Sequence, residues 1–300
     1  MGNQISKLKP HILSFFRSYP RLDSYRHSVL TGSFRGYTSL FRLLPDFIII
    51  GAQKCGTSSF YDYLIKHPAI HVARQKEIHF FEADFQSGLI FYKRNFPTKI
   101  EKSFVENIER KKFITGECSP EYLIHPLVPK RLVKTIPNIR LIILLRNPVD
   151  RAYSHYNFNV RRGWEKNSFE EAIQLEESRL KGEVDKIVKN ESYLGKNLLF
   201  YSYLARGRYF EQINFWQTYF PKEQFFFIQT EDLEKNPQEI LKKTFNFLGL
   251  DLFKIDDMQR LNVGNYKKMT HETRLKLIEY FKPHNEKLYN FLGKKFEWDI

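Results

Sequence analysis

Residues 47–66 read FIIIGAQKCGTSSFYDYLIK, and this stretch decides the fold. Its first four residues form an apolar run of strand length, and Phe60, Tyr61 and Leu64 then recur at helical spacing. Between the two patterns lies a loop with glycines at positions 51 and 56. The sequence therefore predicts a strand, a glycine-rich loop and a helix in direct succession.

This loop has the chemistry of an anion-binding site. Glycines let successive backbone N–H groups point inward, and the helix that follows adds its positive N-terminal end. Lys54 places a full charge inside the loop, and Thr57 and Ser58 add hydroxyl groups. We expect the loop to bind a phosphate or sulfate group through a contiguous set of residues, namely Lys54, Cys55, Gly56, Thr57 and Ser58.

The spacing of the loop differs from that of ATP- and GTP-binding proteins. In the pattern G-x-x-x-x-G-K-[ST] a lysine directly follows the second glycine. Here Thr57 stands at that place and the lysine has moved to position 54. A turn that only joins a strand to a helix is the alternative, but a lysine and two hydroxyls in one loop favour a phosphate-ester site.

The composition indicates a basic, globular protein of 300 residues. Lys and Arg number 48 against 34 Asp and Glu, a net charge of +14, which favours anionic ligands. The basic residues are scattered, which disfavours nucleic acid as a partner. With two cysteines, Cys55 and Cys118, and no apolar run near the roughly 18 residues of a membrane span, we expect a reducing, cytoplasmic setting and no transmembrane segment.

Residues 1–44 are basic and aromatic, with glycines that interrupt any long helix. We expect them to form an N-terminal extension, followed by a single domain over residues 45–300. The first six residues, MGNQIS, also match the N-myristoylation pattern, which arises readily by chance.

Beyond the loop, apolar runs alternate with helical patterns. Further strands are expected at 69–72, 112–116, 140–145 and 225–228. The run RLIILL at 140–145 shows no alternation, as a parallel strand covered on both faces requires. The pattern predicts an α/β fold of P-loop type, with three layers and a central parallel sheet flanked by helices. The charged segment 181–191 is expected to be mobile.

In such folds ligands bind at the carboxyl ends of the strands, and Lys54, Glu77, Glu117 and Arg146 each follow a predicted strand. A magnesium-dependent NTPase would carry an acidic metal ligand near the place of Arg146. The arginine counts against a metal site, and its guanidinium group can grip a second phosphate. Ser154, on the next helix, can add a hydroxyl. Two anion sites on neighbouring strands suit a nucleotide phosphorylated at both ends.

Two motifs resemble those of sulfotransferases that use 3′-phosphoadenosine-5′-phosphosulfate (PAPS), especially heparan sulfate sulfotransferases and bacterial relatives. GAQKCGTSSFYDYL at 51–64 is similar to the family's 5′-phosphosulfate loop, and LRNPVDRAYS at 145–154 is similar to its 3′-phosphate motif. The resemblance covers residues 45–296. It implies that the loop binds the 5′-phosphate of PAPS and that Arg146 and Ser154 bind the 3′-phosphate.

A third motif, KEIHFF at 76–81, is similar to the segment of heparan sulfate sulfotransferases that carries the catalytic glutamate. The resemblance implies Glu77 as the base and His79 in the acceptor site, with His79 the second candidate for the base. Lys54 is then expected to stabilise the leaving oxygen during in-line transfer. From residue chemistry alone, a glutamate beside a lysine is more often an ion pair.

The chain departs from the heparan sulfate enzymes at two places. Those enzymes carry a lysine where this chain has Cys118, and a disulfide-bearing loop that ends in Lys-Gly-Arg near the C-terminus. Here Lys267 and Lys268 occupy a comparable place and are expected to contact the donor. These differences weaken the inference of a heparan substrate more than that of the donor.

The predicted function is metal-independent transfer of a sulfuryl group from PAPS to a hydroxyl of a saccharide or small molecule. Two alternatives remain open: a P-loop kinase of a small molecule that requires Mg²⁺, and a non-enzymatic protein that binds anionic polymers. The oligomeric state is also open. In the two enzymes the loop binds a nucleotide, whereas in the polymer-binding protein it is only structural.

Overall fold

The computed structural model describes residues 35, 38–259, 264 and 266–298. Its centre is a sheet of five parallel strands in the order β2-β3-β1-β4-β5. The strands are β1 (Phe47–Gly51), β2 (Ile70–Val72), β3 (Ile114–Cys118), β4 (Arg140–Leu145) and β5 (Phe225–Gln229). The predicted parallel sheet is confirmed.

The central strands are apolar along their whole length because both faces of the sheet are covered. All residues of β1 are buried, as are all residues of β4 after its first. Phe47 on β1 pairs with Gly116 on β3, and a Cβ atom at Gly116 would lie 2.4 Å from Cζ of Phe47. The glycine therefore makes room for the aromatic ring between the two strands.

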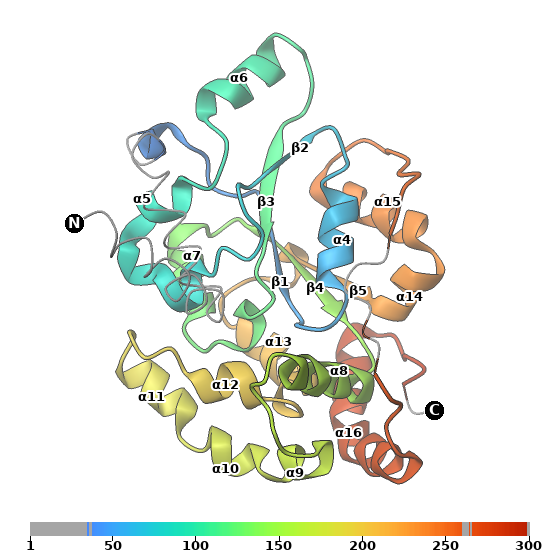
Figure 1. Cartoon of the computed structure of the whole chain (residues 1–300). Helices are drawn as coiled ribbons and strands as arrows, with labels where there is room; N and C mark the ends of the chain where they lie inside the picture. Colours follow the sequence, from blue (N-terminus) through green and yellow to red (C-terminus); the bar gives the residue numbers. More distant parts are fainter. Residues whose placement is uncertain (1–34, 36–37, 260–263, 265, 299–300) are drawn as a thin grey trace, which may run out of the picture.

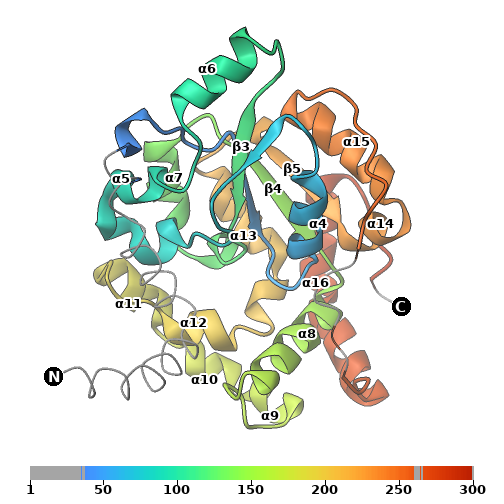
Figure 2. The same ribbon diagram turned by 45° about the horizontal axis from the view of Figure 1, so that its top comes forward.

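Helices cover both faces of the sheet, as the two views show (Figures 1 and 2). On one side lie α4 (Thr57–Leu64), α14 (Thr230–Lys235) and α15 (Pro237–Leu248). On the other side lie α7 (Val128–Thr135) and α13 (Tyr209–Gln217). This arrangement of helix, sheet and helix is the predicted three-layer fold.

Further helices lie beyond each end of the strands (Figure 1). At the carboxyl ends lie α8 (Pro148–Arg161), α9 (Phe169–Gln174), α10 (Glu176–Leu180), α11 (Glu183–Lys189), α12 (Lys196–Tyr201) and α16 (His271–Leu292). The remaining α-helices are α5 (Gly88–Lys93) and α6 (Lys99–Asn107). Single turns are η1 (Ser39–Phe41), η2 (Phe80–Asp84), η3 (Phe85–Ser87), η4 (Tyr122–Ile124), η5 (Ala205–Gly207) and η6 (Lys222–Gln224).

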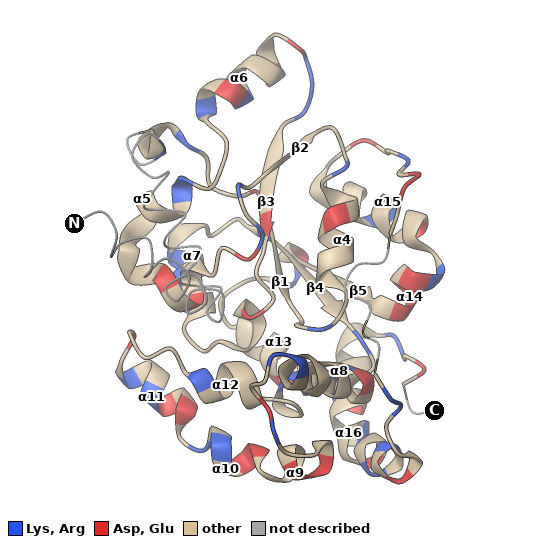
Figure 3. Cartoon of the chain, viewed as in Figure 1, with Lys and Arg blue, Asp and Glu red and all other residues tan. Residues whose placement is uncertain are grey.

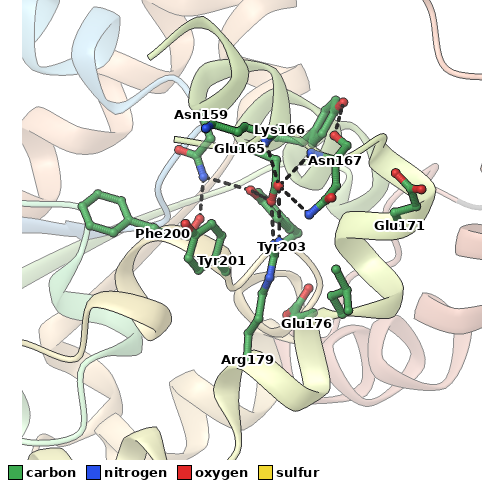
Figure 4. Close-up of polar contacts among 12 residues, drawn as sticks. Asn159, Glu165, Lys166, Asn167, Glu171, Glu176, Arg179, Phe200, Tyr201 and Tyr203 are labelled. Carbon is green, nitrogen blue, oxygen red and sulfur yellow. Dashed lines mark hydrogen bonds and ion pairs between the residues drawn. The ribbon is translucent and has the colours of Figure 1, made fainter. Parts of the chain in front are cut away.

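The buried carboxylate of Glu165 ties together the helices at the carboxyl ends (Figure 4). It accepts hydrogen bonds from Arg179 Nη1 on α10 at 2.6 Å, from the Tyr203 hydroxyl at 3.0 Å and from the Asn167 N–H at 3.1 Å. Burial alone would raise the pKa of Glu165, but the bond from Arg179 lowers it. The segment that follows α8 is thereby fixed against α10.

The charged segment 181–191 forms α11 over most of its length, and its mobility stays a prediction. Ile187 is buried and packs so closely on Gly195 that a Cβ atom there would lie 2.5 Å from its Cδ1. Glu183, also buried, accepts a hydrogen bond from the Tyr193 hydroxyl at 2.9 Å. Two inward-facing residues are enough to anchor an otherwise charged helix.

Of the predicted N-terminal extension, only residues 35 and 38–44 are described. Arg42 connects this part to the body, since its Nη1 donates to the Phe96 carbonyl at 2.7 Å. The myristoylation pattern lies outside the described residues, and the single-domain boundary stays a prediction. None of the helices in the described residues is long and apolar enough to cross a membrane.

Candidate active site

The loop between β1 and α4 has the predicted form. Gly56 directly precedes α4 with φ of 81°, a left-handed conformation that favours glycine. The loop is held from β5 and its following helix, because Thr230 Oγ1 donates to the Cys55 carbonyl at 2.8 Å. Thr57 and Ser58 then form the first turn of α4, whose N–H groups begin without helical partners.

Lys54 lies in this loop among other cations. Burial and the charges of Arg161, Arg146 and Arg151 lower the pKa of Lys54 to about 8. Its ammonium group lies 4.6 Å from the centre of the Phe158 ring on α8. A negative charge placed here would relieve the repulsion between these groups.

Arg146 leaves the end of β4, the strand next to β1, and reaches the same loop. Its Nη1 donates to the Lys54 carbonyl at 3.3 Å, and its own carbonyl accepts a hydrogen bond from the Tyr209 hydroxyl at 2.8 Å. The structure thus brings Lys54 and Arg146 together at one edge of the sheet. A ligand could contact both residues without leaving this edge.

Lys54 and the arginines near it lie beyond ion-pair distance of every acidic side chain that the structure describes. Among the described residues, none of the ion pairs involves Lys54, Arg146, Arg151 or Arg161. Figure 3 shows basic residues on the loop after β1 and where α8 ends. Arg151 is fully buried, and its Nε and Nη1 have no hydrogen-bond partner within the described part. Such uncompensated charge fits an anionic ligand such as a doubly phosphorylated nucleotide.

Arg151 and Arg161 were missed by the sequence reasoning. The only sequence signal for Arg151 was its place inside the motif 145–154, in which roles were assigned to Arg146 and Ser154 alone. Ser154 is buried on α8, one residue after Tyr153.

Lys267 and Lys268 lie in the segment before α16. The Tyr153 hydroxyl donates to the Lys267 carbonyl at 2.9 Å, which places this segment beside the residue that precedes Ser154. Both lysine side chains are exposed. Their contact with the donor stays a prediction.

The segment 76–81 also reaches the loop, as predicted. The Lys76 ammonium group donates to Ser58 Oγ and lies 3.2 Å from the Glu77 carboxylate. The sequence reasoning assigned no role to Lys76. Its only sequence signal was its position directly before Glu77 in the motif.

Glu77 and His79 form a charged pair. Burial alone would raise the pKa of Glu77, but the hydrogen bond from His79 and the charge of Lys76 lower it to about 2. Burial lowers the pKa of His79, but Glu82, which contacts Nδ1, and Glu77, 3.8 Å from Nε2, raise it well above the ordinary value. These shifts favour an ionised Glu77 carboxylate and a protonated His79 imidazole.

Glu117 corrects one prediction, because it lies inside β3 and is fully buried. Its carboxyl group accepts hydrogen bonds from the hydroxyls of Tyr92 at 2.5 Å, Ser119 at 2.8 Å and Tyr122 at 3.2 Å. Burial raises the pKa of Glu117 to about 7. The predicted strand 112–116 ended too early, because a buried glutamate breaks the apolar pattern.

The hydroxyls around Glu117 support the segment that carries Glu77 and His79. Ser119 Oγ accepts a hydrogen bond from the His79 N–H at 3.4 Å, and the Tyr122 hydroxyl accepts one from the Phe80 N–H at 3.1 Å. Glu77 and His79 have φ of 60° and 57°, values that are strained for residues with a side chain. These hydrogen bonds hold that backbone in place.

Both cysteines are free and buried. The thiol of Cys55 lies 3.5 Å from the Tyr209 hydroxyl, and its N–H donates to the Ala52 carbonyl at 3.2 Å. Cys118 ends β3 with its sulfur 3.9 Å from the Thr57 carbonyl, and burial raises the pKa of its thiol. The residue at the end of β3, Cys118, therefore adds no charge to this edge of the sheet.

Comparison with known proteins supports the reading of these motifs. The chain is 29% identical to the membrane-associated sulfotransferase kil1 of Dictyostelium discoideum, over 85% of this chain and 66% of that protein. It is 27% identical to heparan sulfate glucosamine 3-O-sulfotransferase 3A1 of Mus musculus, over 85% of this chain and 65% of that protein. The chain thus spans slightly less than two thirds of each relative.

A solved structure shares the fold. The crystal structure of a sulfotransferase from Alicyclobacillus acidocaldarius superposes with a TM-score of 0.63 and 28% identity, covering 86% of this chain and 100% of that one. The sulfotransferase domain family matches residues 44–298, which include the loop after β1, the segment 76–81 and the residues that follow β4. The chain therefore belongs to the sulfotransferase domain family.

Proposed function

We propose that this protein transfers a sulfuryl group from PAPS to a hydroxyl of a saccharide or small-molecule acceptor. The observation that carries the proposal is the contact of Arg146 Nη1 with the Lys54 carbonyl, which puts two cationic groups from neighbouring strands at one edge. Family membership supports the reaction type. The relative that acts on heparan sulfate supports a saccharide as acceptor.

The proposed donor site divides between the two strands. Lys54, Thr57 and Ser58 hold the 5′-phosphate at the start of α4. Arg146 and Ser154 hold the 3′-phosphate beside α8. PAPS supplies the sulfuryl group, and the cations around Lys54 stabilise the negative charge that builds on the leaving phosphate.

Glu77 is the proposed base. Its side chain is 40% exposed, so an acceptor hydroxyl can reach it. His79 is the weaker candidate, because its contacts with Glu77 and Glu82 favour the protonated imidazole, which cannot accept another proton. The low pKa makes Glu77 a weak base, so positioning of the acceptor has to supply much of the rate.

A thermal-shift experiment with 3′,5′-ADP, ATP and GTP, each with and without Mg²⁺, tests the donor assignment. We expect 3′,5′-ADP to raise the melting temperature without metal, and the Lys54→Ala and Arg146→Ala variants to lose most of that shift. Stabilisation by ATP only in the presence of Mg²⁺ would favour the kinase. Binding to heparin that falls steeply with salt, unaccompanied by any shift with nucleotides, would favour the polymer-binding alternative.

We also propose a cytoplasmic setting. Free, buried Cys55 and Cys118 support a reducing compartment. Fractionation of cells that express the full chain tests this, and recovery of the protein in the membrane pellet would contradict it.

A further inference from the structure

We propose that Lys76 is a further catalytic residue, whose ammonium group binds the 5′-phosphate of the donor together with Ser58 and faces the base Glu77. This inference rests on the proposed function, because it takes the loop after β1 as the 5′-phosphate site and Glu77 as the base. It adds a group that the sequence motifs did not single out.

The position of Lys76 is fixed by two partners on different elements. Its Nζ donates to Ser58 Oγ in the first turn of α4 and lies 3.2 Å from Glu77 Oε1 on its own segment. The side chain is 27% exposed, so the ammonium group is held in place and still accessible to a ligand. Any anion that binds Ser58 Oγ also comes within reach of Lys76.

Lys76 supplies a charge that the end of β3 lacks. β3 ends on Cys118, a buried thiol whose pKa is raised by burial, so this strand contributes no cation to the edge. Lys76 lies next to this strand end, because the N–H of the following residue, Glu77, donates to the Cys118 carbonyl at 3.0 Å. Lys54 and Lys76 thus bring two ammonium groups to one loop.

This placement matches the charges that change during transfer. The bond from sulfur to the leaving phosphate oxygen breaks, a bond from sulfur to the acceptor oxygen forms, and the acceptor proton passes to the Glu77 carboxylate. Negative charge therefore grows on the phosphate while it disappears from Glu77. Lys76 contacts both Ser58 and Glu77. As Glu77 loses its negative charge, the attraction of Lys76 to that carboxylate falls, and the ammonium group stabilises the phosphate instead.

The surroundings of Glu77 make a pH profile informative. The charged and titratable groups that face it are Lys76 and His79 on its own segment, Lys54 from the loop and the uncharged thiol of Cys118 from β3. Removal of the Lys76 charge leaves one cation fewer beside the carboxylate. The proton affinity of Glu77 should rise, and activity should fall off at a higher pH on the acid side.

The test compares the Lys76→Met and Lys76→Arg variants of the full chain with a matched control, Lys66→Met. Lys66 lies just beyond the other end of α4, is 33% exposed and forms an ion pair with Asp62 at 3.3 Å. We expect Lys76→Met to weaken 3′,5′-ADP binding about tenfold and to move the acid limb of the kcat/KM profile upward by about one pH unit. Lys76→Arg should recover most of both effects, and Lys66→Met should show neither.

The outcomes separate this inference from the proposed function. If the unaltered protein binds 3′,5′-ADP and transfers sulfate while Lys76→Met matches it in affinity and pH profile, the role of Lys76 is refuted and the proposed function stands. If the unaltered protein neither binds 3′,5′-ADP nor transfers sulfate, both are refuted. Equal losses in Lys76→Met and Lys66→Met would show a general effect of charge and would also refute the role of Lys76.

Discussion

The ammonium group of Lys54 carries a proton that it holds weakly. Because burial and the nearby arginines lower its pKa to about 8, the charged form is lost as the pH rises through 8 in the free protein. A bound phosphate restores the charge. We expect 3′,5′-ADP binding to take up protons near pH 8 and few at pH 6, measured by titration calorimetry in two buffers of different ionisation enthalpy. Equal heats in both buffers at pH 8 would contradict this.

Glu77 gives the second prediction at the scale of the residue. Glu77→Gln keeps the shape of the side chain but removes the group that accepts the proton, so 3′,5′-ADP should bind within a few-fold of normal while turnover falls at least about 100-fold. Binding by calorimetry and turnover with a sulfate acceptor measure the two effects. Turnover near normal would transfer the role of base to His79.

Individual site residues could be proposed from the sequence where one short motif contained the side chains that bind or react. Lys54 and Arg146 each sit at the end of an apolar run, so the sheet alone brings them to one edge. Lys76 and Glu117 could not be assigned in this way, because their roles depend on partners far along the chain, such as Ser58 for Lys76 and Tyr92 for Glu117. No short pattern encodes those contacts.

At the scale of the element, Glu117 makes β3 sensitive to pH. Its pKa is about 7 in the folded protein and near its ordinary value of about 4.3 in the unfolded chain. As the pH rises from 4 to 7 the unfolded chain loses this proton first, so stability falls by up to about 3 kcal/mol. Glu117→Gln should remove that part of the pH dependence, as denaturant unfolding at pH 5 and pH 8 would show. An unchanged difference between the two pH values would contradict it.

The N-terminus of α8 gives a second prediction at this scale. Asn147 Oδ1 accepts a hydrogen bond from the Val149 N–H at 3.0 Å, and the cap directly follows Arg146. Asn147→Ala should lower the free energy of unfolding by about 1 kcal/mol and weaken 3′,5′-ADP binding. The matched control is Thr98→Ala, which removes the cap of α6. Denaturant unfolding and calorimetry should show a loss of stability in both variants, larger for Asn147→Ala because Asn147 Nδ2 also donates to the Trp298 carbonyl, and a loss of affinity only in Asn147→Ala.

Elements were predictable where a continuous apolar pattern existed. The run 140–145 became β4 with the predicted bounds, because a strand covered on both faces leaves no polar position. The helix α11 was missed because its anchoring depends on Ile187 packing on Gly195, a contact with the next segment of the chain. The end of β3 was missed because Glu117 is polar yet buried.

At the scale of the molecule, a residue near the C-terminus supports the proposed 3′-phosphate site at Arg146. Trp298 is 2% exposed, its ring lies 5.9 Å from that of Tyr209, and its carbonyl accepts a hydrogen bond from Asn147 Nδ2 at 3.1 Å. Trp298→Ala should cost about 3–5 kcal/mol of stability and weaken 3′,5′-ADP binding through Arg146. Thermal unfolding and calorimetry measure both, and unchanged affinity would show that this support is not needed.

The sheet order places Lys54 and Arg146 on either side of one seam, the pairing of β1 with β4. β2 and β3 lie beyond β1 on one side, and β5 lies beyond β4 on the other. A nucleotide held at both ends would bridge the backbone bonds between β1 and β4 and share any load applied across them. If the two halves were drawn apart in a single-molecule force experiment, rupture at this seam would therefore require a larger force with 3′,5′-ADP bound.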